Sequence, residues 1–151
     1  KNFGRALILV LDSLVQREPQ GVRETALLCL QELVTGQPSF FSDFAEVVAT
    51  KLFETYRNCS QVERHTAAMV DRTIERLLGT IETTRAIEIL VPVINSETVP
   101  LLQVATRLLS GVLRKMPPKE VLAHLETVLP GVVAAFSNPN PDVRKAAVFC
   151  L

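Results

Sequence analysis

The side chains best suited to catalysis or metal binding in this sequence are two histidines, His65 and His124, and the cysteines Cys29, Cys59 and Cys150. Zinc ligands usually come as closely spaced His or Cys pairs, because one turn or loop must present two of them to the same ion. No H-x-x-x-H or C-x-x-C spacing occurs here. We therefore expect ordinary surface or half-buried histidines and no metal site.

Cys29 and Cys150 occupy the same place in a repeated motif, V-R-x-x-A-x-x-C-L, which begins at Val22 and again at Val143. A catalytic nucleophile is not expected twice in register, so both are predicted to be core thiols. Cys59 lies in a predicted loop, where its reactivity would depend on a low-pKa environment. The carboxylates are scattered, and neither a glycine-rich phosphate loop nor a G-x-S-x-G motif is present. The sequence therefore predicts no enzyme and no cofactor.

Charge and composition argue against further classes of function. The 151 residues carry 16 basic and 16 acidic side chains, which leaves no net charge to attract nucleic acid. No apolar run approaches the roughly 18 residues that span a bilayer, and no signal peptide is visible at the start of the sequence. Three cysteines, an odd number, indicate reduced thiols in the cytoplasm. With no Trp and one Tyr, the core must consist of Leu, Val, Ile and Ala, which favours closely packed helices.

The strongest organising feature is an internal repeat. The two copies of the motif lie 121 residues apart, which accommodates three periods of about 40, a length typical of HEAT repeats. A small residue recurs at Ala26, Ala67, Ala105 and Ala147, at spacings of 41, 38 and 42 residues. A small side chain at such positions lets two helix backbones approach closely where they cross.

Apolar residues spaced i, i+3, i+4 and i+7 predict eight helices, near residues 3–16, 20–35, 42–57, 60–78, 84–94, 98–116, 118–136 and from 141 onward. Pro92 and Pro130 lie 38 residues apart inside two of them and are predicted to kink both. Ser60 begins a capping-box pattern, Thr98 is a candidate cap and Pro118 suits a first helical turn. Because the connections are short, neighbouring helices are expected to be antiparallel. The predicted fold class is all-α, an α-solenoid of HEAT-type helix pairs.

We expect residues 1–151 to form a single domain of about four helix pairs. The chain opens within one apolar periodic segment and stops within another, at Val148 to Leu151, which predicts a domain cut at both ends. Solenoid ends normally carry a polar cap, because each repeat buries its apolar side only against its neighbours. An exposed apolar face is therefore predicted near Leu151.

In a solenoid the loops inside each helix pair line up along one edge, where a partner protein can bind. Basic residues flank these predicted loops: Arg17 and Arg23 the first, Arg57 and Arg64 the second, Arg144 and Lys145 the fourth. Two interpretations stay open. The motif arginines, Arg23, Arg64 and Arg144, can pair with acidic residues of the neighbouring repeat and hold the register. Alternatively the edge meets an acidic protein, for which Arg17 and Arg57, nearer the loop tips, are the better candidates.

With these repeats and loops, the chain resembles a TOG domain, the tubulin-binding HEAT array of microtubule regulators. In particular it resembles the C-terminal TOG domain of the CLASP family, the cytoplasmic-linker-associated proteins. The most specific stretch runs from Val143 to Leu151. The others are Glu18-Pro19 with Val22-Arg23 and Ala26, Gln37-Pro38 with Phe40, Phe41, Ala45 and Glu46, and Leu90 to Ile94. The chain departs from the family pattern in lacking the first-loop Trp that many TOG domains place against tubulin.

The resemblance implies a non-catalytic protein-binding module of a regulator that stabilises microtubules at plus ends, in the spindle and at kinetochores. It also implies that the intra-repeat loops face tubulin, which places these residues on or near the binding edge: Arg17, Gln20, Arg23, Arg57, Arg64, Asn140, Arg144 and Lys145. Two alternatives stay open. One is an adaptor platform that binds cytoplasmic linker proteins or kinetochore proteins rather than tubulin. The other is a HEAT scaffold of the transport-receptor type, unrelated to microtubules.

Overall fold

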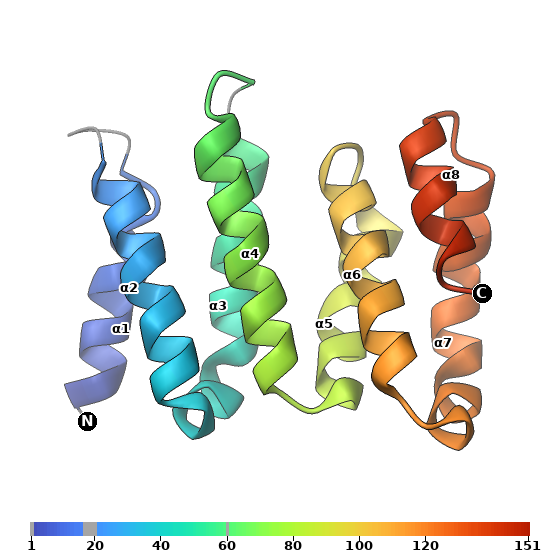
Figure 1. Ribbon diagram of the computed structural model, residues 1–151, viewed down its shortest axis with the longest axis horizontal. Coiled ribbons are helices and arrows are strands. Elements are labelled where there is room, and N and C mark those ends of the chain that lie inside the picture. Colours follow the sequence, from blue (N-terminus) through green and yellow to red (C-terminus); the bar gives the residue numbers. More distant parts are fainter. Residues whose placement is uncertain (1, 17–20, 60) are drawn as a thin grey trace. The chain divides into compact units, whose positions relative to one another are not determined.

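The computed structural model describes residues 2–16, 21–59 and 61–151, and within these ranges every regular element is a helix. The helices are α1 (Asn2–Ser13), α2 (Val22–Gly36), α3 (Pro38–Asn58), α4 (Arg64–Thr80), α5 (Thr83–Ser96), α6 (Leu101–Lys115), α7 (Pro118–Phe136) and α8 (Pro141–Val148) (Figure 1). The all-α prediction is confirmed, and the predicted ranges agree with the observed ones to within a few residues. In the described ranges, no helix combines the length and the apolar character that crossing a bilayer requires.

The chain divides into two compact units, Lys1–Ile81 and Glu82–Leu151, and each holds two helix pairs. In the first unit α1 packs on α2 and α3 on α4, while α2 also contacts α4 (Figure 1). In the second unit α5 pairs with α6 and α7 with α8, and between the pairs α6 contacts α8 and α5 contacts α7. Stacking of equivalent helices on one another is the packing of a helix-pair repeat.

Each unit has a core built mainly from aliphatic side chains, as the composition predicts. Leu27, Leu52 and Ile74 are fully buried in the first unit. Leu90 and Leu101 are buried in the second. Burying one such side chain stabilises the folded state by roughly 2 kcal/mol. The cores therefore hold the helix pairs together.

The recurring small residues lie at buried helix contacts in three of four cases. Ala26, Ala105 and Ala147 are buried, whereas Ala67 is half-buried and Thr66 beside it is only 4% exposed. The prediction is therefore wrong at Ala67. The reason is that α4 turns Thr66 toward α2, where its hydroxyl meets a carboxylate, so the preceding residue occupies the contact.

The two internal prolines lie inside helices, as predicted, with Pro92 in α5 and Pro130 in α7. Next to Pro130, the backbone of α7 approaches α5 closely. A Cβ atom built on Gly131 would lie 2.9 Å from Cγ2 of Ile94 and 2.9 Å from Oδ1 of Asn95. Glycine therefore permits the α5–α7 contact, which a larger side chain would force apart.

The helix starts agree only in part with the predicted caps. Pro118 is the first residue of α7, as predicted. The prediction that Thr98 caps α6 is wrong, because the N-cap position is taken by Pro100. The capping box at Ser60 lies outside the described residues, and α4 begins at Arg64, later than the pattern suggests.

Cys29 is exposed, so its prediction as a core thiol is wrong. Ala26, Leu27 and Leu30 belong to the buried stripe of α2. At about 100° per residue, Cys29 lies about 60° farther from the middle of that stripe than Ala26 does, which carries its side chain to the surface. The matching residue Cys150 is half-buried, because it follows the end of α8 and lies in a turn.

Candidate protein-binding edge

The intra-pair loops that the structure describes lie at one end of each unit (Figure 1). In the first unit the described loop joins α3 to α4. In the second unit they join α5 to α6 and α7 to α8. Arg17 and Gln20, which the sequence places in the first loop, lie outside the described residues. The other six predicted edge residues lie in or beside these loops, and their surroundings differ sharply.

Arg23, at the start of α2, holds two helix pairs in register. Its Nη1 donates to Oε1 of Glu63 at 2.7 Å, and the Arg23 side chain is only 7% exposed. Glu63 immediately precedes α4 and lies 40 residues farther along the chain. The structural interpretation of the motif arginine is thus confirmed at this position. Because the guanidinium is buried and paired, it is poorly placed to reach a partner protein.

Two further side-chain hydrogen bonds connect α2 to α4. Thr66 donates its hydroxyl proton to Oε1 of Glu24 at 2.7 Å. This bond lowers the pKa of the Glu24 carboxyl, and a backbone hydrogen bond lowers it further, while burial acts in the opposite direction. Deeper in the contact, Nε2 of Gln31 donates to Oγ1 of Thr73 at 2.9 Å. The partners are separated by about one repeat length, so polar bonds as well as apolar packing fix the register.

Arg57 and Arg64 are the exposed arginines of the α3–α4 loop region. Arg57 lies in the last turn of α3, where a positive charge is favourable to the helix dipole. Between them, Val62 is 93% exposed. We add Val62 to the residues that are candidates for contact with a partner protein, because its apolar side chain does not pack within the unit. The sequence signal for it was weak, since one valine in a polar loop forms no pattern.

In the second unit, Asn140 and Arg144 organise the loop before α8. Oδ1 of Asn140 accepts hydrogen bonds from the backbone N–H groups of Asp142 and Val143, at 2.8 and 3.4 Å, and so caps the helix. Nη1 of Arg144 donates to the carbonyl oxygens of Asn138 and Pro139, at 2.9 and 2.8 Å. Arg144 thus binds its own loop rather than an acidic residue of a neighbouring repeat. It remains exposed, as does Lys145.

Contacts between the two helix pairs of the second unit involve His124 and Cys150. Nε2 of His124 lies 3.3 Å from Oγ1 of Thr84. The Sγ atom of Cys150 donates to the carbonyl oxygen of Thr106 at 3.5 Å. Burial raises the pKa of the Cys150 thiol to about 11, although Arg114 opposes this shift. His124 and Cys150 therefore occupy packing positions, and no group of three metal-binding side chains occurs among the described residues.

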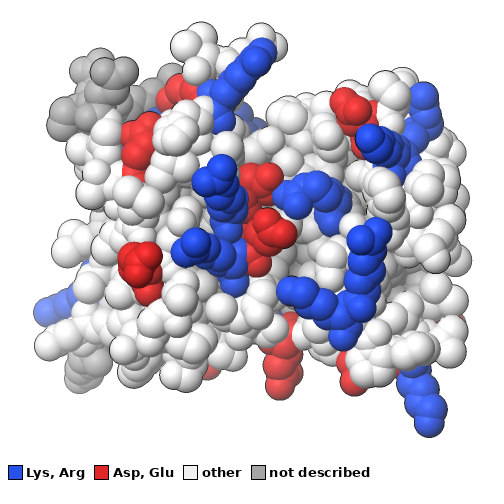
Figure 2. Space-filling view, viewed as in Figure 1, with Lys and Arg blue, Asp and Glu red and all other residues white. Residues whose placement is uncertain are grey.

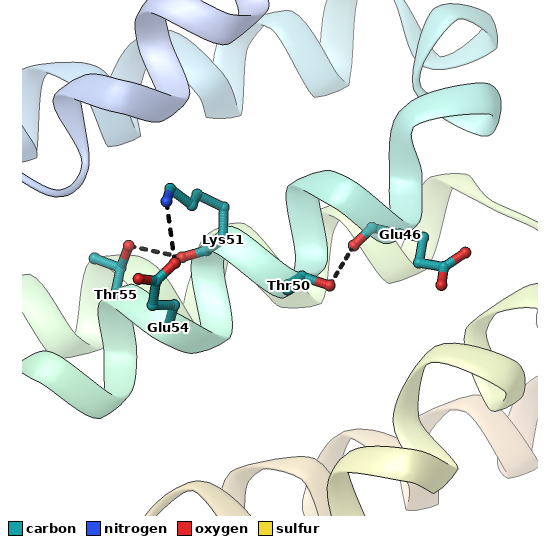
Figure 3. A network of polar contacts seen from close by, with 5 residues as sticks. All are labelled: Glu46, Thr50, Lys51, Glu54 and Thr55. Atoms are coloured by element: carbon teal, nitrogen blue, oxygen red, sulfur yellow. Dashed lines mark hydrogen bonds and ion pairs between the residues drawn. The ribbon is translucent and has the colours of Figure 1, made fainter.

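Charges of both signs are mixed on the molecular surface. On the face shown in Figure 2, Lys and Arg side chains stand among uncharged surface with acidic side chains between them. Helix α3 shows the same alternation at close range, where Nζ of Lys51 lies 3.0 Å from Oε2 of Glu54 (Figure 3). On the same helix the hydroxyls of Thr50 and Thr55 donate to the backbone carbonyls of Glu46 and Lys51 (Figure 3).

Apolar side chains are exposed at the end of the second unit, as predicted. Phe149 is 51% exposed and Leu151 is 85% exposed. The guanidinium carbon of Arg114 lies 5.5 Å from the centre of the Phe149 ring, a cation–π distance. A second exposed apolar group, which the sequence did not single out, lies on α7 and consists of Leu122, Leu125, Leu129 and Val133.

Stacked helix pairs bridged at about forty-residue separations define a helix-pair repeat module. Residues 128–151 match the family model described as HEAT repeat. Over its whole length the chain is 26% identical to CLIP-associating protein 1 of Xenopus tropicalis and 28% identical to CLIP-associated protein of Arabidopsis thaliana. It is also 26% identical over its whole length to Protein CLASP-2 of Caenorhabditis elegans.

The chain spans 10% of the length of the first two relatives and 15% of the third. The similarity thus concerns one segment of much longer proteins. The chain is a helical repeat module that matches the HEAT repeat over residues 128–151 and is similar to one segment of the CLIP-associating proteins.

Proposed function

We propose that the chain is a non-catalytic protein-binding module of a microtubule regulator and that its intra-pair loops face αβ-tubulin. The observation that carries this proposal is the set of exposed bases beside the loops, Arg57 and Arg64 in the first unit and Arg144 and Lys145 in the second. Exposed charges at loop ends steer an oppositely charged partner and set specificity. The whole-length similarity to CLIP-associating proteins supports this class of partner.

Within this proposal, residues 1–151 are part of a TOG-type domain similar to the C-terminal one of the CLASP family, and the parent protein acts at microtubule plus ends, spindles and kinetochores. Arg17, Gln20, Arg23 and Asn140 complete the proposed edge. Arg23 and Asn140 act indirectly, because one is paired with Glu63 and the other caps α8. They hold the loops in the position from which the exposed bases reach the partner.

Size-exclusion chromatography of the chain mixed with αβ-tubulin at tens of micromolar tests the proposal. Co-elution of the two proteins is the expected result. Separate elution at low ionic strength, where attraction between surface charges is strongest, would contradict it.

The second candidate function is an adaptor platform that binds a cytoplasmic linker or kinetochore protein through a helix face. It is favoured by the exposed apolar group on α7, in which Leu122 is 67% and Val133 is 54% exposed. The names of the relatives, which describe association with CLIP, point to the same class of partner. Capture of a linker-protein fragment that is lost in Leu122→Ser, but kept after charge reversal at Arg57, would select this candidate over the first.

A further inference from the structure

Helix α6 of the second unit carries basic side chains and no acidic ones. Arg107, Arg114 and Lys115 belong to it, and its sequence contains neither Asp nor Glu. All three bases are exposed. Figure 2 views this face of the molecule, and Lys and Arg side chains lie over the position that α6 has in Figure 1. The exposed face of α6 is therefore positive, although the chain as a whole has no net charge.

An exposed glycine, Gly111, lies in the middle of this positive face. It follows Arg107 by four residues, and it precedes Arg114 by three and Lys115 by four. Residues three and four apart share one face of a helix, so the bases surround the glycine. Glycine inside a helix is less favourable than alanine, because it loses more conformational freedom on folding. Gly111 therefore weakens α6 unless its missing side chain serves another purpose.

Packing within the chain does not require a glycine at position 111. A Cβ atom built on Gly111 would have no atom within 4 Å beyond the adjoining backbone of α6. Gly131 is the opposite case, since a Cβ atom there would lie 2.9 Å from Ile94. What Gly111 provides is a bare stretch of helix backbone, which a bound segment can approach more closely than it could approach a side chain.

Two of the bases beside Gly111 have no acidic partner. Neither Arg114 nor Lys115 forms an ion pair with an acidic side chain in the described part of the chain. The guanidinium of Arg114 lies over the ring of Phe149, with 5.5 Å between its carbon and the ring centre. A planar guanidinium can donate two parallel hydrogen bonds to one carboxylate. Charge complementarity at these two bases therefore selects an acidic ligand.

The extent of the positive face fits a short protein segment better than a nucleic acid. The chain carries 16 acidic side chains as well as 16 basic ones, so a long polyanion would meet acidic groups beyond α6. Arg107 and Lys115 are separated by eight residues, which is about 12 Å along a helix. Four residues of extended peptide cover about 13 Å. A peptide with a few carboxylates therefore covers the face of α6 without reaching other helices.

We propose that this face of α6 binds an extended acidic segment of a partner protein. The backbone of the segment crosses α6 over Gly111, and its carboxylates bind Arg114 and Lys115. Both bases lie in the last turn of α6, at the end that is joined to α7 and away from the intra-pair loop between α5 and α6. The inference thus goes beyond the proposed function and does not rest on it.

Nuclear magnetic resonance of the chain titrated with an end-blocked peptide of four alternating Glu-Gly units tests the proposal. We expect a saturable shift of the Gly111 amide signal, and an affinity at least about tenfold higher than for the same peptide with Gln in place of Glu. The affinity should fall as salt is added. No saturable shift at Gly111, or an equal response to the two peptides, would overturn the proposal. Tighter binding of an eight-nucleotide single strand to this face would overturn it in favour of a nucleic acid.

A substitution that keeps every charge tests the role of the glycine. Gly111→Leu places a side chain where the peptide backbone passes, and we expect it to weaken binding of the Glu peptide about fivefold or more. It should also raise the urea midpoint of unfolding, because leucine favours a helix more than glycine does, so the weaker binding cannot come from unfolding.

Gly36→Leu is the matched control for Gly111→Leu. Gly36 is the last residue of α2 in the first unit, and a Cβ atom built on it would also meet no atom within 4 Å. This variant should bind the Glu peptide within about twofold of the original chain. Unchanged affinity in Gly111→Leu, or equal loss in both variants, would refute the proposal.

A second pair of variants tests the charges. Arg114→Gln/Lys115→Gln removes the two bases that bind the carboxylates and should weaken binding of the Glu peptide about tenfold or more. Arg72→Gln/Arg76→Gln removes the same charge from exposed positions of α4 and should stay within about twofold of the original chain. Equal weakening in both variants would show a general attraction between peptide and chain, and would refute a site on α6.

The peptide titration uses no tubulin, so its result is independent of the proposed function. If the chain binds the Glu peptide but not tubulin, the site on α6 stands and the proposed partner is wrong. If the chain binds tubulin but not the Glu peptide, the site on α6 is wrong and the proposed function stands.

Discussion

Arg23 and Glu63 lie 40 residues apart in the sequence, yet their side chains meet at 2.7 Å across two helix pairs. The arginine is almost fully buried, whereas the Glu63 side chain is 32% exposed. Removing the partner of a buried charge is more costly than removing an exposed pair, because the remaining charge keeps its desolvation penalty. The pair therefore fixes the register of one helix pair against the next.

Glu63→Gln is expected to lower the free energy of unfolding by about 2 kcal/mol, because Arg23 then lacks a counter-charge. Urea denaturation followed by circular dichroism measures the change. Glu88→Gln is the matched control, since it removes an ion pair with Arg85 that is exposed on both sides, at 3.3 Å. The control should cost about 0.5 kcal/mol or less. Equal effects of the two substitutions would show that the Arg23–Glu63 pair does not stabilise the fold.

Thr73→Val should destabilise the chain by about 1–2 kcal/mol, because the buried amide of Gln31 loses its closest acceptor. The double variant Gln31→Leu/Thr73→Val should cost less than the sum of the single changes, because both polar partners are then gone. Denaturation of the three variants measures this coupling. Strict additivity would show that the bond contributes nothing to the contact between α2 and α4.

The pKa of Glu24 should be found below its ordinary value when its carboxyl carbon is titrated by nuclear magnetic resonance, chiefly because Thr66 donates to it. The pKa is lower in the folded chain than in the unfolded chain. Glu24 therefore stabilises the fold above its unfolded pKa, and this contribution is lost as the pH falls through its folded pKa.

Thr66→Val should raise the pKa of Glu24 and reduce this acid-dependent part of the stability. Thr50→Val is the control, since the Thr50 hydroxyl donates to the backbone carbonyl of Glu46 and not to a carboxylate (Figure 3). An unchanged Glu24 pKa in Thr66→Val would contradict the assignment.

Cys150 should resist alkylation at pH 8, whereas the exposed Cys29 should be modified readily. Burial raises the pKa of Cys150 to about 11, and the thiolate is the reactive form. We expect modification of Cys150 to be about a hundredfold slower than that of a free thiol of ordinary pKa. Mass spectrometry of iodoacetamide-treated chain measures both sites, and Cys150 labelled as fast as Cys29 would refute the packing described for it.

The repeat, the helix pairs and most helix ends were predictable from the sequence, because apolar periodicity and the forty-residue spacing are properties of the chain alone. The Arg23–Glu63 ion pair was predictable only in part, because the repeated motif indicates the arginine but not its acidic partner. Cys29 shows the limit of motif matching. It shares a motif position with Cys150. Cys29 lies within α2 and Cys150 follows the end of α8, so the two cysteines have different surroundings.

The candidate edge was less predictable than the fold. Asn140 and Arg144 were predicted as edge residues, yet their hydrogen bonds to the loop before α8 depend on local backbone geometry that no spacing reveals. Val62 was missed because its importance comes from exposure alone. A small cavity beside Arg23 is lined by residues from the chain after α1, the start of α2 and the last turns of α3, which only the packed helices bring together.

Calorimetric titration of αβ-tubulin with a charge-reversed variant tests the proposed binding of tubulin by exposed bases at the loop ends. Arg64→Glu/Lys145→Glu changes one exposed base in each unit beside the loops, and we expect affinity to fall about tenfold or more. Arg72→Glu/Lys119→Glu makes the same change in charge at exposed positions away from these loops and should stay within about twofold of the original chain. Equal loss in both variants, or no binding by the unaltered chain, would contradict the claim.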